Sequence, residues 1–392
     1  MKFRLGVNYW PASSAMYWWR RFDRAEVVRD FARIRAAGFD NVRIFLLWED
    51  FQPQAGLASP AALESLLTVA DAASAEGLSL VPTLFTGHMS GANWLPAWAI
   101  EPGSPAGRFR IVSGGRVVDG KPRSWFDDAG VVEAQVLLAR EVAASLRAHP
   151  ALWAYDLGNE NSNCSIPATR ESGIAWLEAV SGAIRAADPV HPITIGLHME
   201  DLEENRRLGP AEAAQACDFL CMHGYPIYAS WASGATDALL LPFLTLITGW
   251  LGRQEVLFEE FGAPTEGPGT PHAAVPLLSE RAAARYTREA LKQLRRFGST
   301  GAVVWCYADY DRSLWTVPPL DEVAHERSFG LWRSDGSEKP ALRSIGDARD
   351  WTRVQTTIDL SWIDIPREEF YDAPLANLKR LYGRFRERYR RM

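Results

Sequence analysis

The sequence predicts a (β/α)8 barrel, in which eight parallel strands close into a cylinder surrounded by helices. Short apolar runs alternate with longer helical stretches along the chain, and eight such pairs can be counted. The short runs are apolar almost without interruption, which is typical of parallel strands buried on both faces. Eight repeats favour a closed barrel over an open, doubly wound sheet. No G-x-G-x-x-G motif opens a helix after the first run, which counts against a dinucleotide-binding sheet.

The expected elements follow one another in regular order. The strands are expected at residues 4–10, 41–48, 78–86, 152–158, 192–198, 218–223, 255–260 and 301–307. The helices are expected at residues 24–37, 59–76, 128–148, 170–187, 211–216, 238–252, 279–297 and 338–354. Residues 1–355 are therefore expected to form one barrel domain, and residues 356–392 a helical extension packed on it.

Two segments depart from a plain barrel. Residues 87–127 separate the third strand from its helix and include GRFRIVSGGRVVDGK, which is typical of a small hairpin. A long loop after a strand lies on the C-terminal face of a barrel, so we expect it to shape the mouth of a site. The chain end, PLANLKRLYGRFRERYRRM, predicts a helix with a basic face. Its apolar face would consist of Leu375, Leu378, Leu381, Tyr382, Phe385 and Tyr389. We expect this face to pack on the barrel, and membrane or nucleic-acid binding is the alternative.

Composition excludes several classes of function. The net charge of −6 provides no general attraction for nucleic acid. The sequence contains no signal-like start and no apolar run of about 18 residues, so no membrane partner is expected. Cys217, Cys221 and Cys306 lie in or beside strand-like runs, which favours buried free thiols in a reducing compartment. We therefore expect a cytoplasmic protein, and the sequence carries no indication of its oligomeric state.

Polar and aromatic residues gather at or near the carboxyl ends of the expected strands. They are Arg43, His88, Asn159, Glu160, His198, His223, Tyr225, Glu259, Glu260 and Trp305. In a barrel these ends form one face, which carries the active site. Glu160 and Glu260 follow strands four and seven, which face each other across the barrel. Such a pair can be held about 5–5.5 Å apart, the separation of a retaining glycosidase. One carboxyl would then donate a proton and the other would attack as an anion.

These motifs resemble clan A retaining glycoside hydrolases, and most of all glycoside hydrolase family 5. The matching pieces are Arg43 in NVRIFLLW, Asn159 and Glu160 in LGNE, His223 and Tyr225 in HGY, Glu260 in EEFG and Trp305 in VVWCY. The phrases HPALWAYDLGNE and FGLWRSDGSEKPAL are also similar to such enzymes, and the resemblance spans about residues 4–350. The combination of NE after strand four with EFG after strand seven is specific, whereas HGY alone is weak.

The resemblance implies a role for each matching residue. It makes Glu160 the general acid/base and Glu260 the nucleophile. Arg43 is implied to donate to the nucleophile and to lower its pKa, and Tyr225 to orient it. Asn159 is implied to bind the 2-hydroxyl of the sugar.

The remaining binding residues are assigned less directly. His223 resembles the family residue beside the nucleophile, and Trp305 resembles the platform under the sugar. His88 corresponds to a site histidine after the third strand, although its neighbours depart from the family pattern. Trp94, in the long loop, is assigned to substrate binding. No metal and no cofactor is expected.

The doublet Glu259-Glu260 raises a question of orientation, because alternate residues of a strand face opposite sides. The family pattern places the nucleophile directly before Phe-Gly, which selects Glu260. We therefore expect Glu259 to point towards the helices or to be capped locally.

The resulting prediction is a retaining β-glycosidase that hydrolyses β-linked oligosaccharides by double displacement. Exo action is favoured, because a cytoplasmic enzyme meets imported oligosaccharides and the 87–127 loop can block the cleft. An exo-β-mannosidase is the leading interpretation, and β-glucosidase or β-galactosidase action is close behind. Alternatives are an endo-β-1,4-mannanase or glucanase and a transglycosylase that uses the same residues. Remoter alternatives are a non-catalytic sugar-binding barrel and a metal-dependent barrel with Glu160, His198, His223 and Glu260 as ligands.

Overall fold

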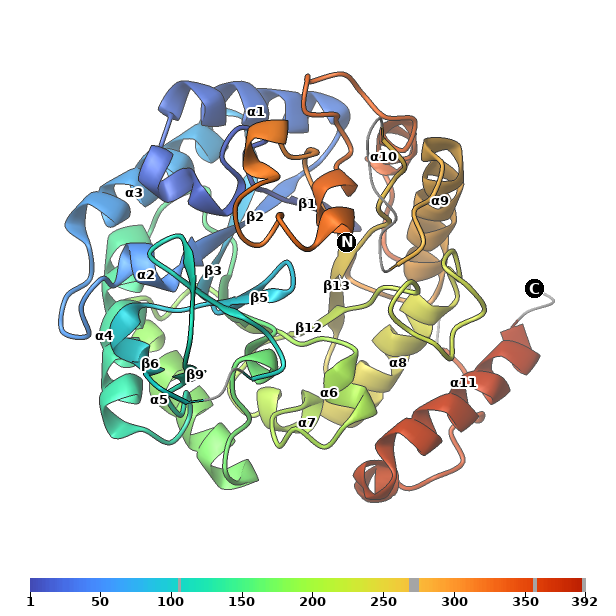
Figure 1. Cartoon of the computed structure of the whole chain (residues 1–392). Helices are drawn as coiled ribbons and strands as arrows, with labels where there is room; N and C mark the ends of the chain where they lie inside the picture. Colours follow the sequence, from blue (N-terminus) through green and yellow to red (C-terminus); the bar gives the residue numbers. More distant parts are fainter. Residues whose placement is uncertain (105–106, 268–274, 355–357, 390–392) are drawn as a thin grey trace.

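The computed structural model of the chain describes residues 1–104, 107–267, 275–354 and 358–389. Its centre is one eight-stranded sheet in which all paired strands run parallel, in the order β11-β10-β3-β2-β1-β14-β13-β12. The strands are β1 (Arg4–Asn8), β2 (Asn41–Leu47), β3 (Ser79–Thr86), β10 (Tyr155–Asn159), β11 (Ile193–Gly196), β12 (Leu220–His223), β13 (Val256–Phe261) and β14 (Gly301–Val304). The cylinder closes between β11 and β12, where the backbone N–H of His223 donates to Leu197 at 2.8 Å. The predicted (β/α)8 barrel is confirmed (Figure 1).

Helices surround the strands (Figure 1). The larger ones are α1 (Arg24–Ala37), α3 (Pro60–Ala75), α4 (Ala129–Leu146), α5 (Arg170–Ala187), α8 (Leu240–Gly252) and α9 (Glu280–Arg296). Short helices are α2 (Trp48–Phe51), α6 (Glu200–Glu203), α7 (Pro210–Ala213) and α10 (Leu342–Ala348). Side-chain caps explain several starts, because Asp23, Ser59, Asp128, Thr169 and Ser279 each accept from a backbone N–H of the first turn.

Two predicted helices are shorter than expected. The stretch 211–216 contains only α7, because its end tightens into i→i+3 turns such as Ala216 N–H to the Ala213 carbonyl before the next strand begins. The stretch 338–354 contains only α10. The strands β1, β2, β11 and β14 end before their predicted carboxyl ends, and residues 305–307 leave the sheet directly after β14 and enter the loop beside the site.

The long segment after β3 forms a small accessory sheet. Its strands are β4 (His88–Met89), β5 (Ala92–Trp94), β7 (Ile111–Ser113) and β8 (Arg116–Val118), and β6 (Ile100–Glu101) pairs separately with β9 (Lys121–Pro122). The predicted hairpin is confirmed as the antiparallel pair β7–β8. The loop tryptophans hold the sheet on the barrel, since Trp98 Nε1 donates to the Gln52 carbonyl at 3.0 Å and Trp125 packs on Trp48.

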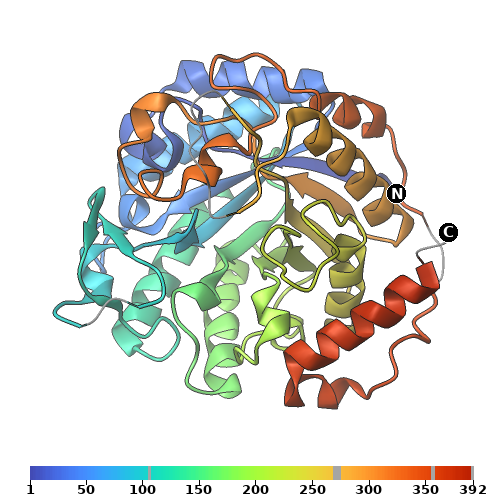
Figure 2. The same cartoon turned by 45° about the vertical axis from the view of Figure 1, so that its right-hand side comes forward.

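The chain ends in helix α11 (Pro374–Tyr389), which lies beside α8 on the outside of the barrel (Figure 2). Helix α8 is almost entirely apolar, LLPFLTLITGWLG, and α11 covers it through Phe385 and Tyr382, whose rings contact Phe243. Leu375 differs from the expected apolar face because it is 39% exposed. The basic side chains are paired in part, Arg380 and Arg384 with Asp364, and Arg388 with Asp359.

Two further observations concern the chain as a whole. None of the helices in the described ranges combines the length and apolar composition needed to cross a bilayer. All four cysteines are free and buried, as expected for those in strand-like runs.

We predict that Phe385→Ala destabilises the protein by about 3–5 kcal/mol, because it opens a cavity between α8 and α11 where Phe385 is fully buried. Chemical denaturation of the variant and the wild type measures this difference. Glu387→Ala, an exposed position on the same helix, is the matched control and should change stability by less than about 0.5 kcal/mol. Equal stability of both variants would contradict the packing role of α11.

Candidate active site

A buried arginine organises the carboxyl end of the barrel. Arg43 in β2 donates through Nη1 to Glu260 Oε1 at 2.6 Å and to Asn8 Oδ1 at 3.2 Å. Its Nη2 donates to Asp156 Oδ2 at 2.7 Å and to Asn159 Oδ1 at 2.9 Å. The guanidinium therefore ties β1, β10 and β13 together from β2. Arg43 is fully buried and does not line the cavity described below, so it acts through Glu260 and Asn159 rather than as a direct binding residue.

Asp156 is a buried carboxylate that the sequence analysis did not select. Besides Arg43, it accepts from Thr83 Oγ1 at 2.6 Å and from the backbone N–H groups of Gly158 and Gly196. Burial raises its pKa to about 6, the charge of Glu259 adds to the increase, and Arg43 opposes both. The signal was present in the sequence, because a charged residue inside the apolar run WAYDLG is seldom buried without a partner.

The expectation for Glu259 is wrong. Its side chain reaches Arg43 Nε at 3.5 Å and His223 Nε2 at 3.4 Å, instead of pointing towards the helices. The pairing of β13 shifts register against both of its neighbours around these residues. This irregularity breaks the alternation of faces, so that two consecutive glutamates contact the same arginine.

Glu160 stands just beyond the end of β10 in a left-handed backbone conformation, with φ of 50°. Such a conformation costs a non-glycine residue about 1–3 kcal/mol and occurs most often at functional sites. Its Oε1 lies 3.1 Å from His223 Nδ1, and Asn163 Nδ2 donates to its Oε2 at 3.2 Å. His198 Nδ1 lies 4.0 Å from the same oxygen.

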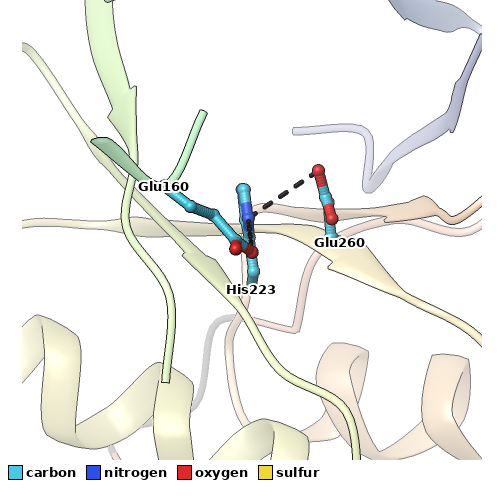
Figure 3. A group of neighbouring side chains, drawn as sticks. All are labelled: Glu160, His223 and Glu260. Carbon is cyan, nitrogen blue, oxygen red and sulfur yellow. Dashed lines mark hydrogen bonds and ion pairs between the residues drawn. The ribbon is translucent and has the colours of Figure 1, made fainter. Parts of the chain in front are cut away.

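Glu260 faces Glu160 across His223. Its Oε1 accepts from Arg43, and its Oε2 accepts from the hydroxyl of Tyr225 at 2.8 Å. His223 Nδ1 lies 3.7 Å from Glu260 Oε1, and Figure 3 shows the imidazole between the two carboxylates. One oxygen of each carboxylate and a ring nitrogen of His223 lie within 4.8 Å of one another.

The protonation of this group is set by burial and by neighbouring charge. Burial alone would raise the pKa of Glu160, but His198 and His223 hold it well below its usual range. Burial raises the pKa of Glu260 and outweighs the opposing effects of His223, Arg43 and Tyr225, contrary to the expectation of a net lowering by Arg43. Burial would lower the pKa of His223, but the surrounding glutamates raise it to about 10. His223 therefore carries a proton near neutral pH.

These residues form the floor of a cavity of about 510 Å³. Of the residues predicted from the sequence, the cavity is lined by His88, Asn159, Glu160, His223, Tyr225, Glu260 and Trp305. Trp305 is the one tryptophan among the described lining residues. The assignment of Trp94 to substrate binding is not supported by its position. Trp94 is fully buried, donates to the Met89 carbonyl at 3.2 Å and packs against Tyr17 inside the accessory sheet.

The cavity is also lined by residues that the sequence analysis did not select. A strap, residues 107–110, crosses the mouth of the barrel from the accessory sheet. Arg108 forms a bidentate pair with Glu200 of α6, and Arg110 pairs with Asp321 in the loop after β14. Between them, Phe109 lies against the ring of His88 and lines the cavity. No local pattern in the sequence predicts these contacts, because each contact joins residues that are far apart in the chain.

Glu160, His223 and Glu260 have the spacing of metal ligands. Arg43 already donates to Glu260 Oε1, and His223 Nδ1 lies at hydrogen-bond distance from Glu160 Oε1, so these ligand atoms have partners within the protein.

Neither a family model nor a curated protein matches the sequence. Solved structures are similar. GH5_18 from Streptomyces cattleya, a variant in complex with Manβ1-4GlcNAc, is 26% identical over 91% of this chain and 82% of that one, with a TM-score of 0.75. An exo-β-1,4-mannosidase from Opitutaceae bacterium strain TAV5 is 28% identical over 90% of this chain, with a TM-score of 0.73. The chain spans 60% of the length of that mannosidase.

A further structure, GH5_18 from Streptomyces cattleya in complex with GlcNAc, shares the fold over 99% of this chain and 91% of its own length, at 24% identity and a TM-score of 0.79. The barrel and the similarity to these enzymes agree with the motifs in β2, β10, β12, β13 and β14. The chain is a glycoside hydrolase, a retaining β-glycosidase that is similar to the clan A enzymes of glycoside hydrolase family 5.

Proposed function

We propose that the protein is an exo-acting β-mannosidase in which Glu260 is the nucleophile and Glu160 the general acid/base. The observation that carries this proposal is the pair of carboxylates that face each other within 4.8 Å on the floor of one cavity. This is close to the separation of about 5–5.5 Å in retaining enzymes and well below the 6.5–9.5 Å of inverting ones.

The reaction proceeds by two displacements. Glu260 attacks the anomeric carbon, the glycosidic bond breaks, and Glu160 gives its proton to the departing oxygen. Glu160 then takes a proton from a water molecule, the water oxygen attacks the anomeric carbon, and the bond to Glu260 breaks. Configuration at that carbon is inverted twice and therefore retained.

The first step needs a proton on Glu160, which is ionised in the free site. His223 is its nearest source, because its protonated Nδ1 lies 3.1 Å from Glu160 Oε1. A bound sugar excludes water from Glu160 and so favours the neutral carboxyl. The proton then moves along the existing hydrogen bond from His223 to Glu160 and onward to the leaving oxygen, and the proton that Glu160 takes from water in the second step returns to His223 by the same hydrogen bond.

The neighbouring side chains orient the reaction. Arg43 and Tyr225 donate to separate oxygens of Glu260 and stabilise its ionised form. Asn159 uses one N–H of its amide to donate to the His88 carbonyl at 2.7 Å, and its Oδ1 accepts from Arg43. Its second N–H remains for the 2-hydroxyl of the sugar, the contact that strengthens most in the transition state.

Two observations support exo action on a mannoside. The strap lines the cavity and is held by arginine–carboxylate pairs to α6 and to the loop after β14, so it obstructs the extended groove that an endo enzyme needs. The similar structures include an exo-β-1,4-mannosidase and a complex with Manβ1-4GlcNAc. We therefore propose a β-mannosyl oligosaccharide as the substrate.

We predict that the enzyme releases one monosaccharide with retained configuration from a p-nitrophenyl β-glycoside, with manno preferred over gluco, galacto and xylo. The panel is assayed together with short β-mannan and β-glucan oligosaccharides, and NMR follows the anomer formed first. Activity should survive a metal chelator. Internal cleavage of the oligosaccharides without release from any aryl glycoside would favour an endo enzyme instead.

We expect Glu260→Gln to reduce kcat/KM by at least about 10³-fold, because the nearly isosteric amide cannot attack the anomeric carbon. Steady-state kinetics on the preferred aryl glycoside measures the loss, and the thermal midpoint verifies the fold. Glu255→Gln, just before the same strand and exposed, is the matched control and should retain activity. A fully active Glu260→Gln enzyme would remove Glu260 from the mechanism.

We expect Glu160→Gln to slow the hydrolysis of poor leaving groups by about 10²–10⁴-fold, the usual contribution of a general acid. Dinitrophenyl glycosides need little protonation, so their first step should be affected far less. The measurement compares the pre-steady-state burst of dinitrophenol with the turnover of a disaccharide in both enzymes. Equal losses on the two substrates would count against Glu160 as the acid.

A further inference from the structure

A second buried carboxylate lines the cavity, and the mechanism above does not use it. Glu326 belongs to the 3-10 helix η5 (Ala324–Ser328) in the loop after β14, and it is only 7% exposed. Its loop follows β14, the strand next to the β13 that carries Glu260, and Glu326 lines the same cavity as Trp305 and Glu260. Glu160 stands on the other side with His198, Glu200 and the strap.

The hydrogen bonds of Glu326 leave part of its carboxylate unused. Ser90 Oγ donates to Oε2 at 3.0 Å, and the hydroxyl of Tyr228 lies 3.3 Å from Oε1. An ionised carboxylate offers about four lone-pair positions. Each oxygen can therefore accept a further hydrogen bond from a ligand in the cavity.

No strong cation balances this carboxylate in the described part of the chain. The basic nitrogen in its reach is His325 Nε2 at 3.7 Å, and burial lowers the pKa of His325 to about 4, so this ring is neutral. Burial raises the pKa of Glu326 to about 7. The buried carboxylate of Asp156, by contrast, forms an ion pair with Arg43. A buried and unbalanced carboxylate on a cavity wall suggests a ligand that completes its hydrogen bonds.

The position of Glu326 identifies the part of the ligand that it meets. The acid protonates the leaving oxygen, so the leaving group lies on the side of Glu160. The sugar whose bond is cleaved lies on the other side, between Glu260 and Trp305. The hydroxyls at C3, C4 and C6 are on the edge of that sugar farthest from the anomeric carbon. A sugar in this orientation would turn that edge towards Ser90, Tyr228 and Glu326, which line the cavity together.

We propose that Glu326 binds two hydroxyls on the C3–C4–C6 edge of the terminal sugar and thereby restricts cleavage to chain ends. The inference rests on the proposed function of the site. A further sugar linked through one of these hydroxyls would replace the donor by an ether oxygen and leave the carboxylate buried without a partner. Internal units of a chain are rejected for that reason.

The test compares Glu326→Gln with wild type on the preferred aryl glycoside and on its 3-deoxy, 4-deoxy and 6-deoxy analogues. We expect Glu326→Gln to lower kcat/KM by about 10–100-fold on the parent, as for the loss of hydrogen bonds to an ionised group. Wild type should lose a similar factor on at least one deoxy analogue. The variant should lose clearly less on that same analogue, because the contact is already absent.

Controls separate the possible failures. Glu338→Gln, an exposed carboxylate further along the loop after β14, should behave as wild type. If Glu326→Gln does not fold, as judged by its thermal midpoint, Glu326→Asp replaces it in the same comparison. Equal deoxy losses in variant and wild type would overturn the contact. A wild-type enzyme inactive on every glycoside would instead refute the proposed function.

A binding measurement provides a readout that is independent of turnover. In the Glu260→Gln background, Glu326→Gln should weaken the binding of a β-linked disaccharide by about tenfold in calorimetry. Unchanged affinity would overturn the proposal, since a carboxylate that accepts hydrogen bonds from the sugar contributes to its binding.

Discussion

The buried guanidinium of Arg43 is the interaction on which the rest of the site depends. It donates from β2 to Asn8 on β1, to Asp156 and Asn159 on β10 and to Glu260 on β13, so Glu260 and the strand end that precedes Glu160 are positioned from inside the barrel core. The planar fork of arginine can meet several acceptors at fixed angles, which a lysine cannot do. Without this cation, Asp156, Glu259 and Glu260 would be buried next to one another with only His223 to balance them.

The charges of the cluster do not cancel, and this imbalance explains how the site keeps a proton. Arg43 and His223 supply positive charge, whereas Asp156, Glu160, Glu259 and Glu260 are four carboxyl groups. Full ionisation would leave net negative charge in a buried site, which is unfavourable. Burial accordingly raises the pKa of Asp156 to about 6 and also raises that of Glu260. The carboxyl groups of such a cluster titrate together, so a proton is shared among them and not assigned to one residue. In the proposed mechanism this sharing helps Glu160, which acts first as an acid and then as a base.

The sequence predicted those features that depend on local pattern. Strand periodicity and the rule that barrel sites lie at strand ends placed Asn159, Glu160 and Tyr225 on one face, and the structure brings them to one cavity. The direction of the Glu259 side chain was predicted wrongly, because the pairing register of β13 is irregular there and its residues do not alternate strictly between the two faces. Trp94 does not line the cavity, because its ring packs against Tyr17 inside the accessory sheet. A tryptophan in a long loop can pack within that loop as well as bind a ligand, and the sequence does not distinguish the two.

Glu326 could not be found from the sequence, since the loop that carries it has no periodicity and its partners come from other loops. Ser90 belongs to the accessory segment after β3, and Tyr228 follows β12. The same accessory segment supplies the strap, which Arg110 joins to the loop after β14. The segment after β3 thus contributes both the strap that lines the cavity and the serine that donates to Glu326. In the proposed function, the two glutamates at the strand ends cleave the bond, and these joined loops select which bond of a chain reaches them.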